Sequence, residues 1–328
     1  MILIHRRSQE TAGIAPEAIA ALTATYDRPF HNDVHALRAP IGIYNVSLGN
    51  LLPRFESVLS AIESVLNNRP FLDRAAYTWD EPFLDAYRIL LYSLPEHLED
   101  CRAILKTLFP DSKSCAADYT ARAYVKAVEP YRRSVARIVN HMKHKHGRLH
   151  SVVSHVGTTV VLEYFVDGVG PDGAIGPARE VHPDGQSAIN VWHDLRFHFA
   201  HIYIVSYHLS RAVEAIMGEG VDTDPVNKPL EDRLADLASR LSRLPLLLDS
   251  DRLDEPLAAV HLKRFADDAR TIRICYPEPG VVFEELTAPM LTTARLVGDG
   301  VTRSFSFPYM RKMREARARG DGPGHLRP

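Results

Sequence analysis

Apolar residues recur at helical spacing along much of the chain, most clearly over 131–156. There they fall three or four positions apart, and Lys145 is the one polar interruption. Such a seam is typical of an amphipathic helix that buries one face. Pro130 precedes the segment, and proline suits a first helical turn. We therefore expect one long helix over 131–156, with the rest of the chain organised around it.

Similar seams predict further helices before and after this segment, over about 16–25, 43–66, 81–108, 187–217 and 230–244. Pro53 and Pro95 fall inside two of them and predict a kink, a break or, at Pro53, the true helix start. Gly218 and Gly220 follow the 187–217 segment, as glycine often does at a helix C-terminus. Short connections favour antiparallel neighbours, so the expected core is an antiparallel helical bundle.

The residues after the central segment change in character. The stretch 158–166 (TTVVLEYFV) is β-branched and aromatic, which is typical of a strand. The tripeptide 171–173 (PDG) predicts a turn. Residues 174–181 would return as a short edge strand, because Pro177 cannot donate to a ladder. We therefore expect a β-hairpin at about 158–182, inserted in a helical domain that covers 1–220.

The last third of the chain predicts a small α+β region over 221–312. Residues 258–269 favour a helix and 271–276 a strand, while 291–297 and 302–307 flank a Gly-Asp-Gly hairpin turn. The basic, Gly-rich end at 313–328 is expected to be a flexible tail. The predicted fold class is mainly α with α+β additions.

Composition and charge exclude several classes of protein. The formal net charge is −2, so any nucleic-acid contact must come from a local basic patch. The three cysteines are widely spaced, form no metal motif and suggest a reducing compartment. The N-terminal residues do not read as a signal peptide, and no apolar run is long enough for a bilayer. We expect a cytoplasmic protein without a membrane partner.

A strip of cations, amides and imidazoles lies beside the apolar seam of the central segment. At about 100° per residue, one arc collects Arg133, Arg137, Asn140, His144, Arg148, Ser151 and His155. The strip contains no carboxylate, whereas an ordinary solvated face mixes both signs. Such side chains bind phosphate, and neutral imidazole serves as a general base. The simpler alternatives are a solvated face, or one paired with acidic helices at Glu96, Glu99 and Asp100.

The strip resembles the signature helix of HEPN-type proteins (higher eukaryote and prokaryote nucleotide-binding), in which an Arg is followed after four to six residues by a His. Arg137 and His144 fit this spacing at its upper limit. The run NHMKHKHGRL also resembles the Asn-x-x-Lys-His run of some bacterial helical proteins associated with this group. Ile138 stands where the family commonly has a polar residue. Many HEPN-type proteins are metal-independent ribonucleases built as helical bundles, with two motifs meeting across a dimer.

The resemblance implies a role for each residue of the motif. Arg137 would hold the scissile phosphate, and His144 would be the acid or base toward the ribose 2′-hydroxyl. Asn140 would orient the phosphate or the imidazole. The neighbouring cations expected to bind substrate are Arg133, Lys143 and Arg148. The implied function is a homodimeric endoribonuclease that cleaves RNA without a cofactor, as bacterial toxins or phage-defence effectors do.

Two other functions stay open. The same helices would also serve as a non-catalytic binding or oligomerisation module. A metal-dependent phosphohydrolase is the second alternative, because ligand pairs four residues apart occur twice, at His146 and His150 and at Asp194 and His198.

Histidines concentrate between 141 and 208, and the adjacent pair His193 and Asp194 faintly resembles the HD phosphohydrolases. We therefore expect the two His-rich helices to face each other around a polar cavity.

Overall fold

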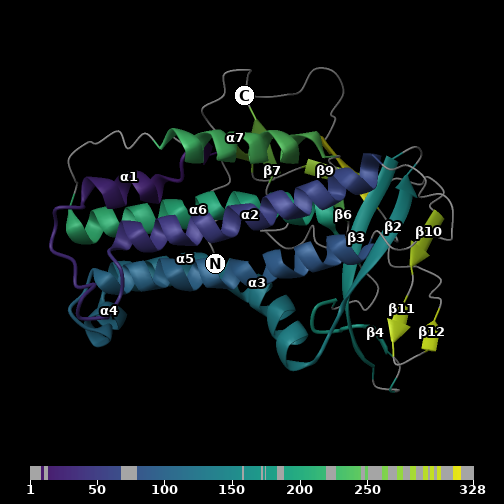
Figure 1. The fold of residues 1–328 in the computed structure, drawn as a ribbon, viewed down its shortest axis with the longest axis horizontal. Helices are drawn as coiled ribbons and strands as arrows, with labels where there is room; N and C mark the ends of the chain where they lie inside the picture. The colour runs from purple at the N-terminus through teal and green to yellow at the C-terminus, as the bar shows by residue number, and fades with distance from the viewer. Residues whose placement is uncertain are drawn as a thin grey trace.

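Long helices lie side by side in the computed structural model, and strands gather at one end of them (Figure 1). The structure describes residues 14–67, 80–156, 159–170, 173, 175–182, 188–218 and 227–244. It also describes short strands at 9–10, 248–249, 261–264, 272–275, 281–285, 291–294, 296–298, 301–303 and 313–318. The fold is mainly helical with a small antiparallel sheet, as predicted at that level.

Four long helices make up the body of the molecule: α2 (Pro40–Asn67), α3 (Asp80–Thr107), α5 (Tyr119–His144) and α6 (Val191–Met217). Three shorter ones surround them: α1 (Glu17–Ala24), α4 (Ser112–Ala117) and α7 (Lys228–Arg243). Helix α6 contacts α1, α3, α5 and α7, so it is buried on nearly every side. Gly218 closes it with a φ of 79°, the left-handed backbone that glycine adopts without strain.

The prolines inside α2 and α3 do not end these helices. Helix α2 begins at Pro40 and runs through Pro53, and α3 runs through Pro95. The predicted break at Pro95 and the predicted start at Pro53 are therefore wrong. Proline removes one helical hydrogen bond, but apolar residues on both sides of each proline are buried and hold the helix in place: Leu52, Phe55, Leu94 and Leu98.

The predicted helix over 131–156 is wrong at both ends, because Pro130 lies inside the helix rather than at its start and the last part of the segment is a strand. Helix α5 covers Tyr119–His144, and the chain then turns into strand β2 (Leu149–Val156). Gly147 fits the turn because a Cβ there would lie 2.5 Å from the His141 ring. Strand β2 contains three valines, whose branched side chains favour strands. Leu149, Val152 and Val156 nevertheless continue the apolar seam at helical steps of three and four, which explains the wrong prediction.

Strand β2 is the centre of the main sheet. It pairs antiparallel with β3 (Thr159–Val169) and with β10 (Leu291–Ala294). Strand β3 also pairs with two short strands, β4 (Ile175–Pro177) and β5 (Ile189–Asn190). The predicted strand at 158–166 is confirmed from residue 159, and the short return strand is β4. The long partner of β3 is nevertheless β2, which the prediction had placed in a helix.

The remaining strands form small antiparallel pairings. Strand β13 (Met313–Ala318) lies between β6 (Leu248–Asp249) and β9 (Val281–Glu285), and β8 (Ile272–Cys275) lies between β1 (Gln9–Glu10) and β7 (His261–Arg264). Strands β11 (Leu296–Gly298) and β12 (Val301–Arg303) form the predicted hairpin.

Two predictions for this part of the chain differ from the structure. The helix expected over 258–269 is wrong at β7, because pairing with the isoleucines of β8 overrides local helix propensity. Residues 313–318 are strand β13 where a flexible tail was predicted, and 319–328 lie outside the described residues.

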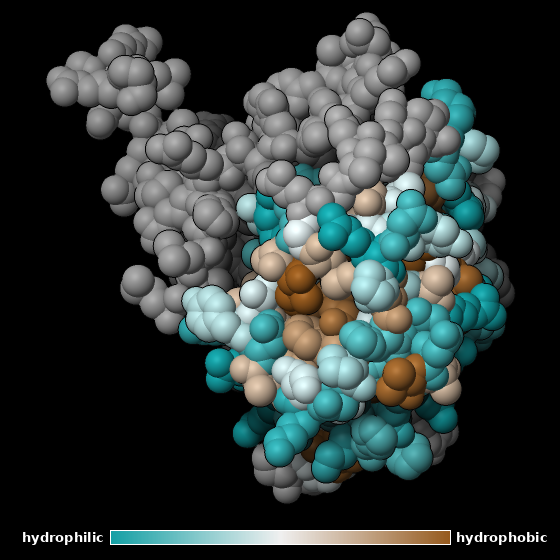
Figure 2. Space-filling view, turned by 90° about the vertical axis from the view of Figure 1, so that its left-hand side faces the viewer, coloured by the Kyte–Doolittle hydropathy of each residue, from teal (hydrophilic) through white to brown (hydrophobic). Residues whose placement is uncertain are grey.

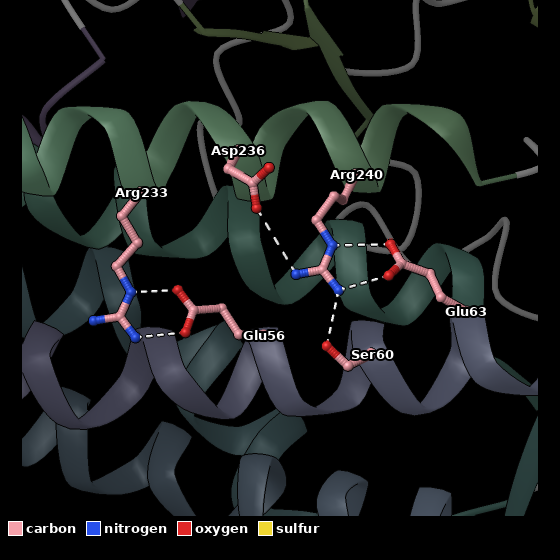
Figure 3. Close-up of polar contacts among 6 residues, drawn as sticks. All are labelled: Glu56, Ser60, Glu63, Arg233, Asp236 and Arg240. Carbon is pink, nitrogen blue, oxygen red and sulfur yellow. Dashed lines mark hydrogen bonds and ion pairs between the residues drawn. The ribbon is translucent and has the colours of Figure 1, made fainter.

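Helix α7 is joined to α2 by ion pairs (Figure 3). Arg240 donates from Nε and Nη2 to the Glu63 carboxylate, each at 2.9 Å, and from Nη2 to Ser60. Arg233 forms a second forked pair with Glu56. The apolar face of α7 lies buried, with Leu234, Leu237 and Leu241 fully enclosed. Helix α7 therefore packs on the preceding helices through buried leucines as well as ion pairs.

Figure 2 faces the end that carries α1 and α4, where apolar residues gather near the middle of the face among hydrophilic ones. Within the described residues, no helix combines the length and the apolar character that crossing a bilayer requires.

The packing of α7 predicts unequal effects for two substitutions. Leu237→Ala should lower the free energy of unfolding by about 2–5 kcal/mol, because it leaves a cavity in the core. Arg240→Ala should cost about 1 kcal/mol or less, because a partly exposed ion pair contributes little. Urea unfolding of both variants measures the difference. Equal losses would contradict an apolar origin of the α7 packing.

Candidate functional site

Three of the predicted site residues share one side of the last turns of α5. Arg137, Asn140 and His144 stand at positions i, i+3 and i+7, which face the same way on a helix. Asn140 and His144 are exposed, and Arg137 is half-buried. At a rise of about 1.5 Å per residue, Arg137 and His144 lie about 10 Å apart along the axis. Their side chains can therefore approach one bound phosphodiester group from two sides.

The cations beside this motif have different surroundings. Arg133 is paired with Glu129, 2.8 Å from Nε to Oε1, and Arg132 binds the same carboxylate. These two arginines lower the pKa of Glu129 to about 2. Lys143 lies over the Tyr92 ring, 5.1 Å from its centroid. Within the described part of the chain, neither Lys143 nor His144 forms an ion pair with the acidic residues of α3.

The other residues of the predicted strip leave the helix. Arg148 lies exposed in the turn after α5, and its backbone N–H donates to Asp167 Oδ1 at 2.7 Å. Ser151 is half-buried in β2, and the side chain of His155 lies outside the described residues. The strip therefore ends at His144, with Arg148 beside its end rather than one helical turn further along.

A His–Asp dyad that the sequence analysis missed lies next to the end of α5. His150 Nε2 donates to Asp167 Oδ2 at 2.7 Å, and each of these two side chains is 11% exposed. The His150 ring stacks on Phe165 at 5.0 Å. A carboxylate in this position orients an imidazole and selects its tautomer. The register of β2 and β3 brings the two residues together across the hairpin, and no local sequence spacing signals it.

His141 ties this dyad to the last turns of α5. Its Nε2 donates to the Asp167 carbonyl at 3.0 Å, and its Nδ1 lies 3.3 Å from a Glu180 carboxylate oxygen. Gly168 completes the contact, because a Cβ there would lie 3.1 Å from His141 Nε2. The dyad and the Arg137–His144 motif are therefore held at the same end of one helix.

Asp194 and His198, the second pair of the metal alternative, are buried in the core. Asp194 Oδ2 accepts hydrogen bonds from the hydroxyls of Tyr87 and Tyr164, each at 2.7 Å. His198 Nε2 lies 3.3 Å from the same oxygen, although its direction is not that of a hydrogen bond. The Tyr131 hydroxyl lies 3.1 Å from His198 Nδ1. This network links helices to the sheet and has a structural role.

The four residues of the metal alternative do not meet in one site. His146 is exposed in the turn with a φ of 57°, and His150 is bonded to Asp167. Asp194 and His198 are 1% and 2% exposed in the core. Across the described ranges, no three His, Cys, Asp or Glu side chains cluster as metal ligands do. The predicted pairing of His146 and His150 on one helix face is wrong, because β2 replaces that part of the helix.

The two His-rich segments do pack against each other, through aromatic rings. Tyr131 of α5 stacks on His201 of α6, with 4.0 Å between ring centroids, and Phe197 contacts both. Burial lowers the pKa of His201 to about 3. Buried aromatic rings and the neutral imidazole of His201 therefore fill this part of the α5–α6 interface, where the sequence predicted a polar cavity.

The known proteins supply no relative for this site. No protein-family model matches the chain, and searches of curated proteins and of solved structures also find no match. The functional assignment therefore rests on the geometry at the end of α5.

Two buried histidines predict that acid destabilises the fold. Burial lowers the pKa of His97 to about 4 and that of His201 to about 3. In the unfolded chain the pKa of both side chains is about 6.5. The unfolded chain thus binds more protons below pH 6.5, so stability falls as the pH drops toward 4. Together the two histidines should lower the free energy of unfolding by at most about 3 kcal/mol for each pH unit in this range. Urea unfolding at pH 7 and 5 tests this, and His201→Phe should weaken the dependence.

We expect that Gly147, in the turn after α5, cannot be replaced by a larger residue without a loss of stability, and Gly176 serves as the matched control. A Cβ on Gly147 would lie 2.5 Å from the His141 ring and 2.8 Å from the Asp167 carbonyl, whereas one on Gly176 would meet nothing within 4 Å. Gly147→Ala should therefore lower the free energy of unfolding by about 1–3 kcal/mol, and Gly176→Ala should be nearly neutral. Chemical denaturation compares them. Equal stability of the two variants would contradict close packing of His141 against the turn.

Proposed function

We propose that this chain is a metal-independent, HEPN-like endoribonuclease that acts as a homodimer, in the manner of a bacterial toxin or phage-defence effector. The observation that carries the proposal is the motif at the end of α5, where half-buried Arg137 shares one helix face with the exposed Asn140 and His144. No carboxylate follows Glu129 on α5, so nothing on this helix face repels a phosphate near the motif.

The motif supplies the groups that RNA cleavage by its own 2′-hydroxyl requires. The His144 imidazole accepts the 2′-hydroxyl proton, and the 2′-oxygen attacks phosphorus while the bond to the 5′-oxygen breaks. Arg137 stabilises the negative charge that develops on the phosphoryl oxygens. Asn140 orients the phosphate from the turn between them. The products are a 2′,3′-cyclic phosphate and a 5′-hydroxyl.

A second protonated group must deliver a proton to the leaving 5′-oxygen. One chain offers a single His144, so a second copy of the motif, brought across a two-fold axis, supplies the other imidazole. Arg133, Lys143 and Arg148 lie around the motif and bind the flanking phosphates as point charges. The side-by-side packing of α2, α3, α5 and α6 supports the antiparallel bundle expected of this family (Figure 1).

One observation favours the alternative of a non-catalytic binding module. Within the described residues, His144 has no carboxylate or carbonyl that orients its ring, unlike His150 with Asp167. A catalytic imidazole is commonly held by such a partner. In the binding-module alternative, the same cations would only hold an anion or a second subunit.

Substitutions in the motif separate these two functions. His144→Asn and Arg137→Lys should each lower the rate of RNA cleavage by about 100-fold or more, because they remove an acid–base group and a forked phosphate contact. His146→Asn is the matched control, since His146 is exposed two residues beyond the motif and should be neutral. The assay is cleavage of a fluorophore–quencher RNA in excess chelator, with folding checked by circular dichroism.

Each outcome of this assay assigns a function. Loss in both motif variants with an active control supports the ribonuclease. RNA binding without cleavage by the wild-type protein would favour the binding module. Activity that disappears in chelator would contradict the metal-independent mechanism.

A further inference from the structure

A hollow of about 930 Å³ opens between the C-terminal half of α3, helix α4 and the first turns of α5. Its apolar lining includes Leu105, Ala121, Val125 and Pro130. Its volume and apolar floor are in the range of ligand sites. Five cations also line it: Arg102, Lys106, Arg122, Lys126 and Arg133.

The carboxylates of this hollow are already engaged. Glu99 pairs with Arg102 at 3.1 Å, and Glu129 binds Arg132 and Arg133. In the part of the chain that the structure describes, Lys106, Arg122 and Lys126 have no carboxylate partner, and all three are exposed. The rim therefore carries uncompensated positive charge that favours an anionic ligand.

The hollow and the Arg137–His144 motif lie along the same side of α5. Positions 122, 126, 129 and 133 recur at steps of four and three and line the hollow. The same steps continue through 137, 140 and 144. At about 1.5 Å per residue, these positions span about 33 Å of helix path, with Pro130 inside the helix between the hollow and the motif. Arg133 is thus the last residue of the hollow and stands one turn before Arg137.

We infer that this hollow binds the single-stranded segment of RNA adjoining the phosphate held by Arg137 and His144, an inference that rests on the proposed function. A linear row of cations matches a polyanionic backbone better than it matches a compact ligand with one acidic group. The apolar floor accepts an unstacked base, which a single strand presents and a duplex does not.

Binding of a non-cleavable strand tests the inference apart from catalysis. The probe is a fluorescein-labelled 12-nucleotide RNA carrying 2′-O-methyl groups throughout, measured by anisotropy over a range of salt concentrations. The variant Lys106→Gln/Lys126→Gln should bind about tenfold more weakly. Its plot of log affinity against log salt should be shallower by about 1.4, since each single-strand phosphate contact contributes about 0.7. Arg38→Gln/Arg54→Gln is the matched control, because both arginines are exposed and outside the hollow.

The apolar floor is tested by Val125→Asp, which should weaken binding of the same probe while Ala123→Asp, exposed on the same helix, should not. Equal affinity of the hollow variants and their controls would overturn the inference. So would equal binding of a 12-base-pair duplex, or displacement of the probe by a long-chain fatty acid, which would assign the hollow to an amphipathic lipid.

Cleavage assays distinguish this inference from the proposed function. Lys126 lies eleven residues before Arg137, about 16 Å along the helix, so the dinucleotide UpA is too short to reach it and Lys106→Gln/Lys126→Gln should cleave UpA like the wild-type protein. The same variant should show a raised KM on a 12-nucleotide RNA. An unchanged KM on the longer RNA would overturn the inference and leave the ribonuclease standing. Probe binding that depends on the hollow in a protein that cleaves neither substrate would support the inference and refute the ribonuclease.

Discussion

A buried carboxylate on the central helix is the constraint on which the rest of the structure depends. Asp194 Oδ2 accepts hydrogen bonds from the hydroxyls of Tyr87 on α3 and Tyr164 on β3. A buried carboxylate without such donors is strongly destabilising. These bonds therefore hold α3, α6 and the sheet together, and next to them the Tyr131 hydroxyl of α5 lies 3.1 Å from His198 Nδ1.

The junction between the end of α5 and strand β2 gives the candidate site its shape. Helix α5 ends at His144, and β2 returns at once along β3. His141 packs closely against both glycines of this junction: a Cβ on Gly147 would lie 2.5 Å from its ring, and one on Gly168 would lie 3.1 Å from its Nε2. The Arg137–His144 motif and the His150–Asp167 dyad are consequently held by the same contacts. A change in the turn is expected to disturb both, even though the two sets of side chains serve different purposes.

The helices could be predicted from sequence because their apolar seams are long and strongly periodic. Arg137, Asn140 and His144 were placed together for the same reason, since positions three and seven apart share a helix face. The turn at Gly147 could not be predicted, because Leu149, Val152 and Val156 continue the helical seam at steps of three and four although they lie in β2. The His150–Asp167 dyad depends on strand register, and the burial of Asp194 depends on tyrosines from two distant elements. Neither leaves a local pattern in the chain.

We propose that one face of α5 binds RNA, with cations along its first half holding the strand and Arg137 and His144 acting on a phosphate at its end. The most direct test is the chemical identity of the RNA ends produced in excess chelator, determined by mass spectrometry. Attack by the 2′-hydroxyl predicts a 2′,3′-cyclic phosphate on one fragment and a 5′-hydroxyl on the other. A 5′-phosphate paired with a 3′-hydroxyl, or intact RNA, would contradict the account.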